Sequence, residues 1–138
     1  MSSSKKSSKK VDWKKSLEIE KMVRVLIKRL QMSWIDPERI YCFESEGSKA
    51  RAYARIWGLS RIWQISLKEK PAYALEVLSE NFNNLSKEKK IEVLLHELSH
   101  IPKTFSGALV PHFRRGKRNF GKKVKDLIEQ NRNLFKLK

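Results

Sequence analysis

Apolar residues recur along this chain at two spacings, one typical of helices and one typical of strands. Between residues 12 and 31 they fall near every third or fourth position, which predicts an amphipathic helix with Asp12 as its N-cap. Short apolar or alternating runs further on are typical of strands. The segment 60–67 fits either element, and we expect a helix. The predicted elements are helices over 12–31, 60–67, 86–100 and 122–135, and strands over 40–43, 52–57 and 73–78.

The segment that follows Ser86 has the clearest helical pattern. Ser86 is a good N-cap, and Pro102, which has no N–H, predicts that the helix ends close to His100. On a wheel of 100° per residue, His96 and His100 lie opposite the apolar arc. The apolar arc consists of Ile91, Leu94, Leu95, Leu98 and Ile101.

The histidines belong to the sequence His-Glu-Leu-Ser-His, which carries the candidate chemistry. Two histidines four residues apart on a helix project from one face, so both imidazoles can reach a single metal ion. Glu97, about 100° further round the helix, can reach a metal-bound water without ligating the metal. This arrangement is typical of a zinc hydrolase, in which the carboxylate accepts the proton of the water.

A third ligand is expected from the loop beyond the helix. The chain contains three histidines, and the third, His112, lies twelve residues after His100. Three nitrogen ligands and one open position are typical of a catalytic zinc site. Asp126 and Glu129, on the predicted C-terminal helix, are the alternatives. For stabilising an oxyanion the sequence offers candidates only by residue type, namely Tyr41, Tyr53 and Tyr73.

The charge is unusually positive, and it is concentrated at the two ends of the chain. With 31 basic and 15 acidic residues the formal net charge is +16, of which residues 1–15 carry +5 and residues 101–138 carry +9. The second group either forms a solvated helix face or contacts phosphates of DNA or RNA. The candidate nucleic-acid-binding residues are Arg114, Arg115, Lys117, Arg118, Lys122 and Lys123.

The remaining composition predicts one cytoplasmic domain. Residues 1–11 are rich in serine and lysine and are expected to form a disordered basic tail, followed by a single domain over 12–138. Cys42 is the only cysteine, which suits a reducing compartment. We expect neither a secretory signal nor a membrane partner, since no apolar run approaches the length of a membrane span. The sequence does not predict an oligomeric state.

From about Lys49 to Phe120 the chain resembles the small predicted zinc metallopeptidases of archaea and phages, which are related to the SprT-like proteases. The resemblance implies zinc on His96, His100 and His112, with Glu97 as the general base. SprT-like proteins usually have glycine directly after the third histidine, whereas this chain has Phe113. The similar segments are 54–59 (ARIWGL), 76–79 (EVLS) and 96–107 (HELSHIPKTFSG).

The expected protein is therefore an α+β, zincin-like metallopeptidase that binds one Zn²⁺ per chain and hydrolyses peptide bonds with a metal-activated water. The expected sheet is small and mostly antiparallel, with about three strands, between an N-terminal helix and the metal-binding helix. The strand over 73–78 is the expected edge strand that pairs with a substrate backbone. The basic ends suggest substrates associated with nucleic acid. The alternatives are a metal-dependent nuclease and a nucleic-acid-binding module with a structural zinc site.

Overall fold

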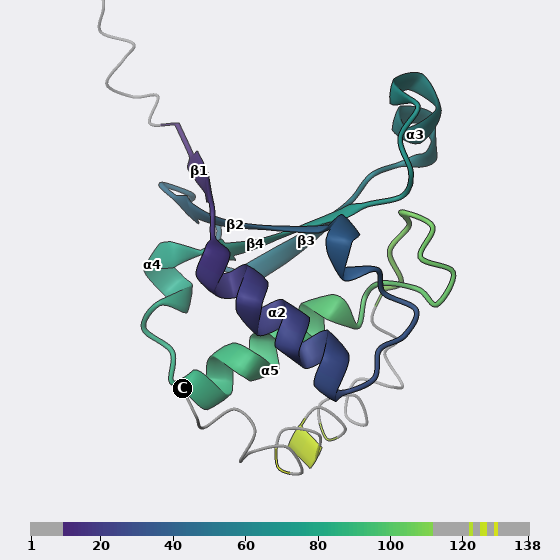
Figure 1. The fold of residues 1–138 in the computed structure, drawn as a ribbon. Helices are drawn as coiled ribbons and strands as arrows, with labels where there is room; N and C mark the ends of the chain where they lie inside the picture. The colour runs from purple at the N-terminus through teal and green to yellow at the C-terminus, as the bar shows by residue number, and fades with distance from the viewer. Residues whose placement is uncertain (1–9, 112–121, 123–124, 127–128, 130–138) are drawn as a thin grey trace, which may run out of the picture.

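Four strands form one mixed sheet, and two helices pack on the same face of it (Figure 1). The computed structural model describes residues 10–111 and positions 122, 125, 126 and 129. In chain order the elements are β1 (Asp12–Lys15), α2 (Leu17–Arg29), the 3₁₀ turn η1 (Pro37–Arg39), β2 (Ile40–Glu46), β3 (Ala54–Gly58), α3 (Arg61–Leu67), β4 (Tyr73–Leu78), α4 (Ser79–Phe82) and α5 (Lys87–Leu98).

The core lies between the sheet and helices α2 and α5. Leu75 of β4 is fully buried, as are Leu94 and Leu98 of α5, and α2 contributes Val23 and Leu26 at 1% exposure each. Each helix turns its apolar stripe to the sheet, so the opposite face of α5 is available for polar side chains. The α+β class predicted from the apolar spacing is confirmed.

The first predicted helix begins later than expected. Residues 12–15 form β1, which pairs antiparallel with β2 in a register that joins Asp12 to Glu46. The N-cap of α2 is Ser16, whose hydroxyl accepts the Ile19 N–H at 3.2 Å. The prediction of Asp12 as the N-cap was wrong, because long-range pairing with β2 holds residues 12–15 in an extended conformation and the helix starts only after Ser16.

The sheet also differs from the prediction. It has four strands in the order β1-β2-β4-β3, and β2 runs parallel to β4 while the other two pairs are antiparallel. The prediction of a small, mostly antiparallel sheet therefore holds for two of the three strand pairs, whereas the expected number of about three strands was one too low. The parallel pair arises because β3 and α3 connect β2 to β4 as a crossover. The short helix α4 was not predicted.

The expected edge strand proves to be central. β4 hydrogen-bonds to β2 on one side and to β3 on the other, and Tyr73, Leu75 and Val77 are at most 2% exposed. All residues of β4 except Ala74 are buried, and near-continuous burial suits a strand with neighbours on both sides and both faces covered. Among the described strands the edges are β1 and β3, and β3 is the edge beside α5 (Figure 1).

Two further predictions concern the ends of the chain. Of the helix expected over 122–135, the structure describes Lys122, Lys125, Asp126 and Glu129, all in helical conformation and exposed. The basic tail expected over 1–11 lies outside the described residues apart from positions 10 and 11. Within the described parts of the chain, no helix combines the length and the apolar character that crossing a bilayer requires.

Candidate active site

His96 and Glu97 near the end of α5, and His100 in the turn that follows, line two hollows beside the edge strand β3. The Ser86 hydroxyl caps the helix by accepting the Lys89 N–H at 3.1 Å, as predicted. The apolar arc is buried, whereas His96, Glu97 and His100 are half-buried. The helix ends at Leu98, and the His100 N–H donates to the Glu97 carbonyl at 3.1 Å in a final tightened turn. The helix and its orientation therefore agree with the wheel drawn from the sequence.

The separation of the two imidazole rings suits a shared metal ion. Their centroids are 5.2 Å apart, and the ring planes are inclined by 78°. With a Zn–N bond of about 2.0–2.1 Å, each ring centroid would lie about 3.2 Å from the ion, and a tetrahedral angle between the ligands gives a centroid separation of about 5.2 Å. The separation of the two rings is therefore compatible with two histidine ligands of one tetrahedral ion.

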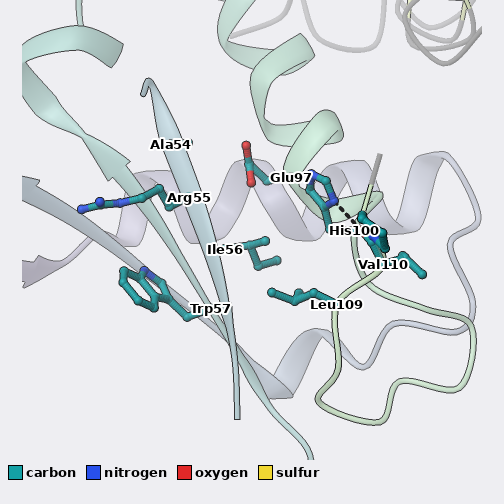
Figure 2. A pocket seen from close by; sticks show the side chains of 9 residues that line it. Ala54, Arg55, Ile56, Trp57, Glu97, His100, Leu109 and Val110 are labelled. Carbon is teal, nitrogen blue, oxygen red and sulfur yellow. Dashed lines mark hydrogen bonds between the residues drawn. The ribbon is translucent and has the colours of Figure 1, made fainter. Parts of the chain in front are cut away.

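The loop after α5 fixes the orientation of His100 (Figure 2). The ring Nδ1 lies 2.7 Å from the carbonyl oxygen of Val110, and the Val110 N–H donates to the His100 carbonyl, also at 2.7 Å. Because a carbonyl can only accept, Nδ1 must carry the proton, so in the neutral ring Nε2 bears the lone pair. A backbone carbonyl behind the ring is the usual support of a metal-binding histidine.

Hydrogen bonds to β4 and α3 hold the same loop in place. The Tyr73 hydroxyl accepts the Gly107 N–H at 2.8 Å and donates to the Ala108 carbonyl at 2.7 Å. Gln64 of α3 donates to the Ser106 carbonyl at 2.8 Å. Gly107 has a φ of +94° and lies so close to Gly58 that a side chain at Gly58 would meet its carbonyl oxygen. The loop is thus anchored just before it reaches position 112.

A cleft of about 440 Å³ lies between β3, the end of α5 and this loop. In Figure 2, the carboxyl group of Glu97 points toward β3, and the side chains of Ile56 and Leu109 lie between β3 and the loop. A second hollow of about 290 Å³ lies at the start of β3 and beside the residues just before it, and includes Tyr53, His96 and Glu97. The residues that line the larger cleft, of about 440 Å³, are Ala54, Arg55, Ile56, Trp57, Glu97, His100, Leu109, Val110 and Pro111.

Glu97 has the electrostatic character of a proton acceptor. Burial beside the cleft raises the pKa of its carboxyl from 4.5 to about 7, because a carboxylate is poorly solvated there. A carboxyl group with a pKa near neutrality can both accept and release a proton under physiological conditions. Its position next to two histidines makes this a functional-site candidate rather than an isolated buried acid.

The opposite side of β3 carries a polar cluster that the sequence analysis missed. Glu76, 1% exposed, accepts the Ser45 hydroxyl at 2.5 Å, the Trp57 N–H at 3.0 Å and two N–H groups of Arg55 at 3.2 and 3.3 Å. Burial alone raises the pKa of Glu76, but these hydrogen bonds outweigh burial and hold it below its ordinary value. The cluster ties the edge strand to the centre of the sheet. Its signal was a glutamate within an otherwise apolar strand.

The structure brings together three of the predicted site residues, His96, Glu97 and His100. His112 lies outside the described residues, although Pro111, immediately before it, lines the cleft. Glu129 lines a hollow with Ser86, Glu88, Lys89, Glu92 and Lys125, at the start of α5. Among the described residues, which include Asp126 and Glu129, no group of three His, Cys, Asp or Glu side chains could hold a metal ion.

The remaining candidates are distributed as follows. Tyr53 lines a hollow with Glu97, whereas Tyr73 is buried with its hydroxyl bonded to the loop, and Tyr41 accepts a hydrogen bond from Arg39. Of the candidate nucleic-acid-binding residues, Lys122 is described and exposed. The others, Arg114, Arg115, Lys117, Arg118 and Lys123, lie outside the described residues.

The HExxH sequence thus lies at the end of a helix that packs against a mixed sheet, with Glu97 in the wall of a cleft. A family model described as "Putative phage metallopeptidase" matches residues 11–132, and the chain belongs to this family. Neither the curated proteins nor the solved structures gave a match to the chain.

Proposed function

We propose that this protein is a zinc-dependent peptidase in which Glu97 is the general base. The observation that carries the proposal is the joint placement of the His96 and His100 rings, 5.2 Å apart, with the half-buried Glu97 carboxyl in the wall of a cleft. Membership of the metallopeptidase family supports the same reaction class. The resemblance to SprT-like proteases belongs to this proposal as well.

His96, His100 and His112 would hold one zinc ion. Support for His112 comes from Pro111, which lines the cleft beside His100 and so brings the chain to the site at the preceding residue. Glu129, the alternative ligand, lies instead beside the first turns of α5. When bound, zinc lowers the pKa of a coordinated water and polarises the carbonyl of the scissile bond.

Glu97 would move the proton during peptide hydrolysis. It accepts a proton from the attacking water and passes it to the amine that leaves, so the carboxyl returns to its starting state. The burial that raises its pKa to about 7 suits both steps. Val110 keeps the His100 ring in one tautomer throughout, through the 2.7 Å contact with Nδ1.

An extended polypeptide is the substrate that the edge of β3 fits. β3 bonds to β4 on one side and no described strand pairs with its other side. The larger cleft lies along β3, and the second hollow adjoins its first residue, Ala54. A substrate strand could therefore add to the sheet through main-chain hydrogen bonds. This assigns to β3 the role that the sequence suggested for residues 73–78.

The basic ends of the chain suggest that the substrates are proteins associated with nucleic acid. The net charge of +16 favours a polyanionic partner, and affinity for DNA should fall steeply with salt if phosphates are contacted. Deleting residues 1–10, or replacing four basic residues by glutamate, should make the affinity for DNA less dependent on salt. The four residues are Arg114, Arg115, Lys117 and Arg118. No DNA binding at low salt would refute this part of the proposal.

Two measurements test the peptidase proposal itself. Purified protein should cleave an unfolded polypeptide and leave single-stranded DNA intact in a parallel assay, and a chelator should stop the cleavage until zinc is restored. Cleavage of DNA alone would favour the metal-dependent nuclease. Bound zinc without either activity would favour a binding module with a structural metal site.

Zinc stoichiometry tests the ligand set. We expect one zinc per chain, no binding in His96→Ala or His100→Ala, and strongly weakened binding in His112→Ala. Glu129→Ala is the matched control and should bind zinc like the parent. The opposite result for His112 and Glu129 would place the third ligand on the C-terminal helix.

A further inference from the structure

In helix α3 the apolar side chains are exposed and a polar side chain is buried, the reverse of the arrangement in helices α2 and α5. Its large apolar side chains face solvent, with exposed fractions of 67% for Ile62, 56% for Trp63, 60% for Ile65 and 56% for Leu67. The buried residue of this helix is the polar Gln64, at 5% exposure. Single exposed apolar residues are ordinary, but four on one seven-residue helix are a concentration that is typical of an interaction site.

Hydrogen bonds fix this outward orientation. The Gln64 amide donates to the carbonyls of Leu59 and Ser106, each at 2.8 Å, so the helix is attached to the domain through its polar residue. Turning the apolar side inward would bury a different set of side chains and break both bonds. The apolar surface is therefore held away from the core, and α3 projects beyond the ends of β3 and β4 (Figure 1).

Cations flank the apolar surface at both ends of the helix. Arg61 precedes it, and Lys68 and Lys70 follow it, all exposed. The one acidic residue nearby, Glu69, forms an ion pair with Arg39 at 3.1 Å, which offsets its charge. Helix α3 thus combines an exposed apolar side that includes Trp63 with positively charged residues at both of its ends.

We propose that α3 is a membrane-contact element that inserts into the interface of a bilayer containing anionic lipid. An exposed apolar helix face with Trp and flanking Lys or Arg is the composition that binds in the headgroup and acyl boundary. Seven residues span about 10 Å, which is far too short to cross the bilayer, so the helix would lie in the interface with its apolar side buried to about 5–10 Å. This contact is independent of the proposed peptidase activity. It departs from the sequence-based expectation of no membrane partner, which rested on the absence of an apolar run long enough to span a bilayer.

The charge and the apolar composition favour lipid over the other occupants. A second copy of the chain would bring two bodies of net charge +16 together at a surface with cations at both ends. Nucleic acid could stack on Trp63, but it offers no apolar layer for Ile62, Ile65 and Leu67. Anionic lipid supplies both the apolar layer and the negative charge.

The test uses the full chain with vesicles of phosphatidylcholine alone and with about one-third phosphatidylglycerol. Binding to the anionic vesicles should fall about tenfold or more in the double variant Ile62→Ser/Trp63→Ser, because two apolar side chains no longer enter the interface. The matched control is Trp13→Ser/Leu17→Ser, which removes an equally exposed pair elsewhere, at 53% and 68% exposure. The control should bind like the parent. Both variants change exposed side chains, so their melting temperatures should stay close to that of the parent.

A second readout separates insertion from general attraction of a basic protein. Lipids brominated on the acyl chains should quench tryptophan emission of the parent, and Trp63→Phe should bind equally well but lose most of that quenching. Equal binding by the α3 variant and the parent would overturn the proposal and leave attraction through charge alone. A parent that is dimeric in solution, with the α3 variant monomeric, would overturn it in favour of a second copy.

Discussion

Replacing Glu97 by glutamine should stabilise the metal-free protein at alkaline pH. Burial raises the pKa of this carboxyl from 4.5 to about 7, so the folded protein holds the proton more tightly than the unfolded chain does. Below pH 4.5 the Glu97 carboxyl is protonated in both the folded and the unfolded state, so it does not change the free energy of unfolding. Above pH 7 the folded state carries a poorly solvated charge, so this group lowers the free energy of unfolding as pH rises from 4.5 to 7.

The size of the effect follows from the same values. The difference between 4.5 and about 7 corresponds to about 3 kcal/mol, and solvent screening of the half-buried group reduces it to about 2 kcal/mol. Glutamine has a similar shape and does not ionise, so it avoids this cost. At roughly 3–5 °C per kcal/mol for a chain of this size, the melting temperature of Glu97→Gln at pH 8 should exceed that of the parent by about 6–10 °C.

Thermal unfolding in the presence of a chelator measures this difference at pH 4.5 and pH 8. The stabilisation should be present at pH 8 and nearly absent at pH 4.5. Glu46→Gln, an exposed carboxylate on β2, is the control and should change little at either pH. Stabilisation of equal size at both pH values, or none at pH 8, would refute burial as the cause of the raised pKa.

Two other substitutions test the supports of the site. Glu76→Gln should lower the free energy of unfolding at pH 7 by about 2–3 kcal/mol, since it removes a carboxylate that accepts four buried or half-buried hydrogen bonds. Because the pKa of Glu76 is lowered in the folded state, the advantage of the parent should begin to shrink as pH falls below about 4.5 and should disappear below the folded-state pKa; urea titrations showing a constant difference would contradict this. Gly58→Ala should destabilise by about 1–3 kcal/mol and weaken zinc binding, because its new methyl group meets the Gly107 carbonyl and displaces the loop that leads to His112. Unchanged stability together with unchanged zinc affinity in Gly58→Ala would show that the loop tolerates the displacement.

Local patterns in the sequence predicted the helix that carries the site. The apolar arc of α5, its cap at Ser86 and the stop imposed by Pro102 are all encoded within a few turns, and the structure has each of them. The grouping of His96, Glu97 and His100 follows directly from helix geometry. No long-range information was needed for these features.

Features that depend on distant partners were not predictable. The pairing of residues 12–15 with β2 joins segments about thirty residues apart, and nothing in these four residues distinguishes a strand from the start of a helix. The central position of β4 depends on a crossover whose direction the apolar spacing does not encode. The carbonyl of Val110 behind His100 is a backbone group, so no residue type announces it. Helix α3 was predicted as a helix. The exposure of its apolar side was not predictable, because it depends on the hydrogen bonds from Gln64 to the carbonyls of Leu59 and Ser106.

The most direct test of the proposed function compares zinc content and cleavage of an unfolded polypeptide in the parent and in Glu97→Gln. Glu97 is not a proposed ligand, so the variant should retain one zinc per chain. Its cleavage rate should fall by at least about 10²–10⁴, the usual contribution of a general base. Retained zinc with cleavage reduced to that extent is the predicted result. Cleavage at the parental rate by a zinc-loaded Glu97→Gln variant would contradict the proposed role of Glu97.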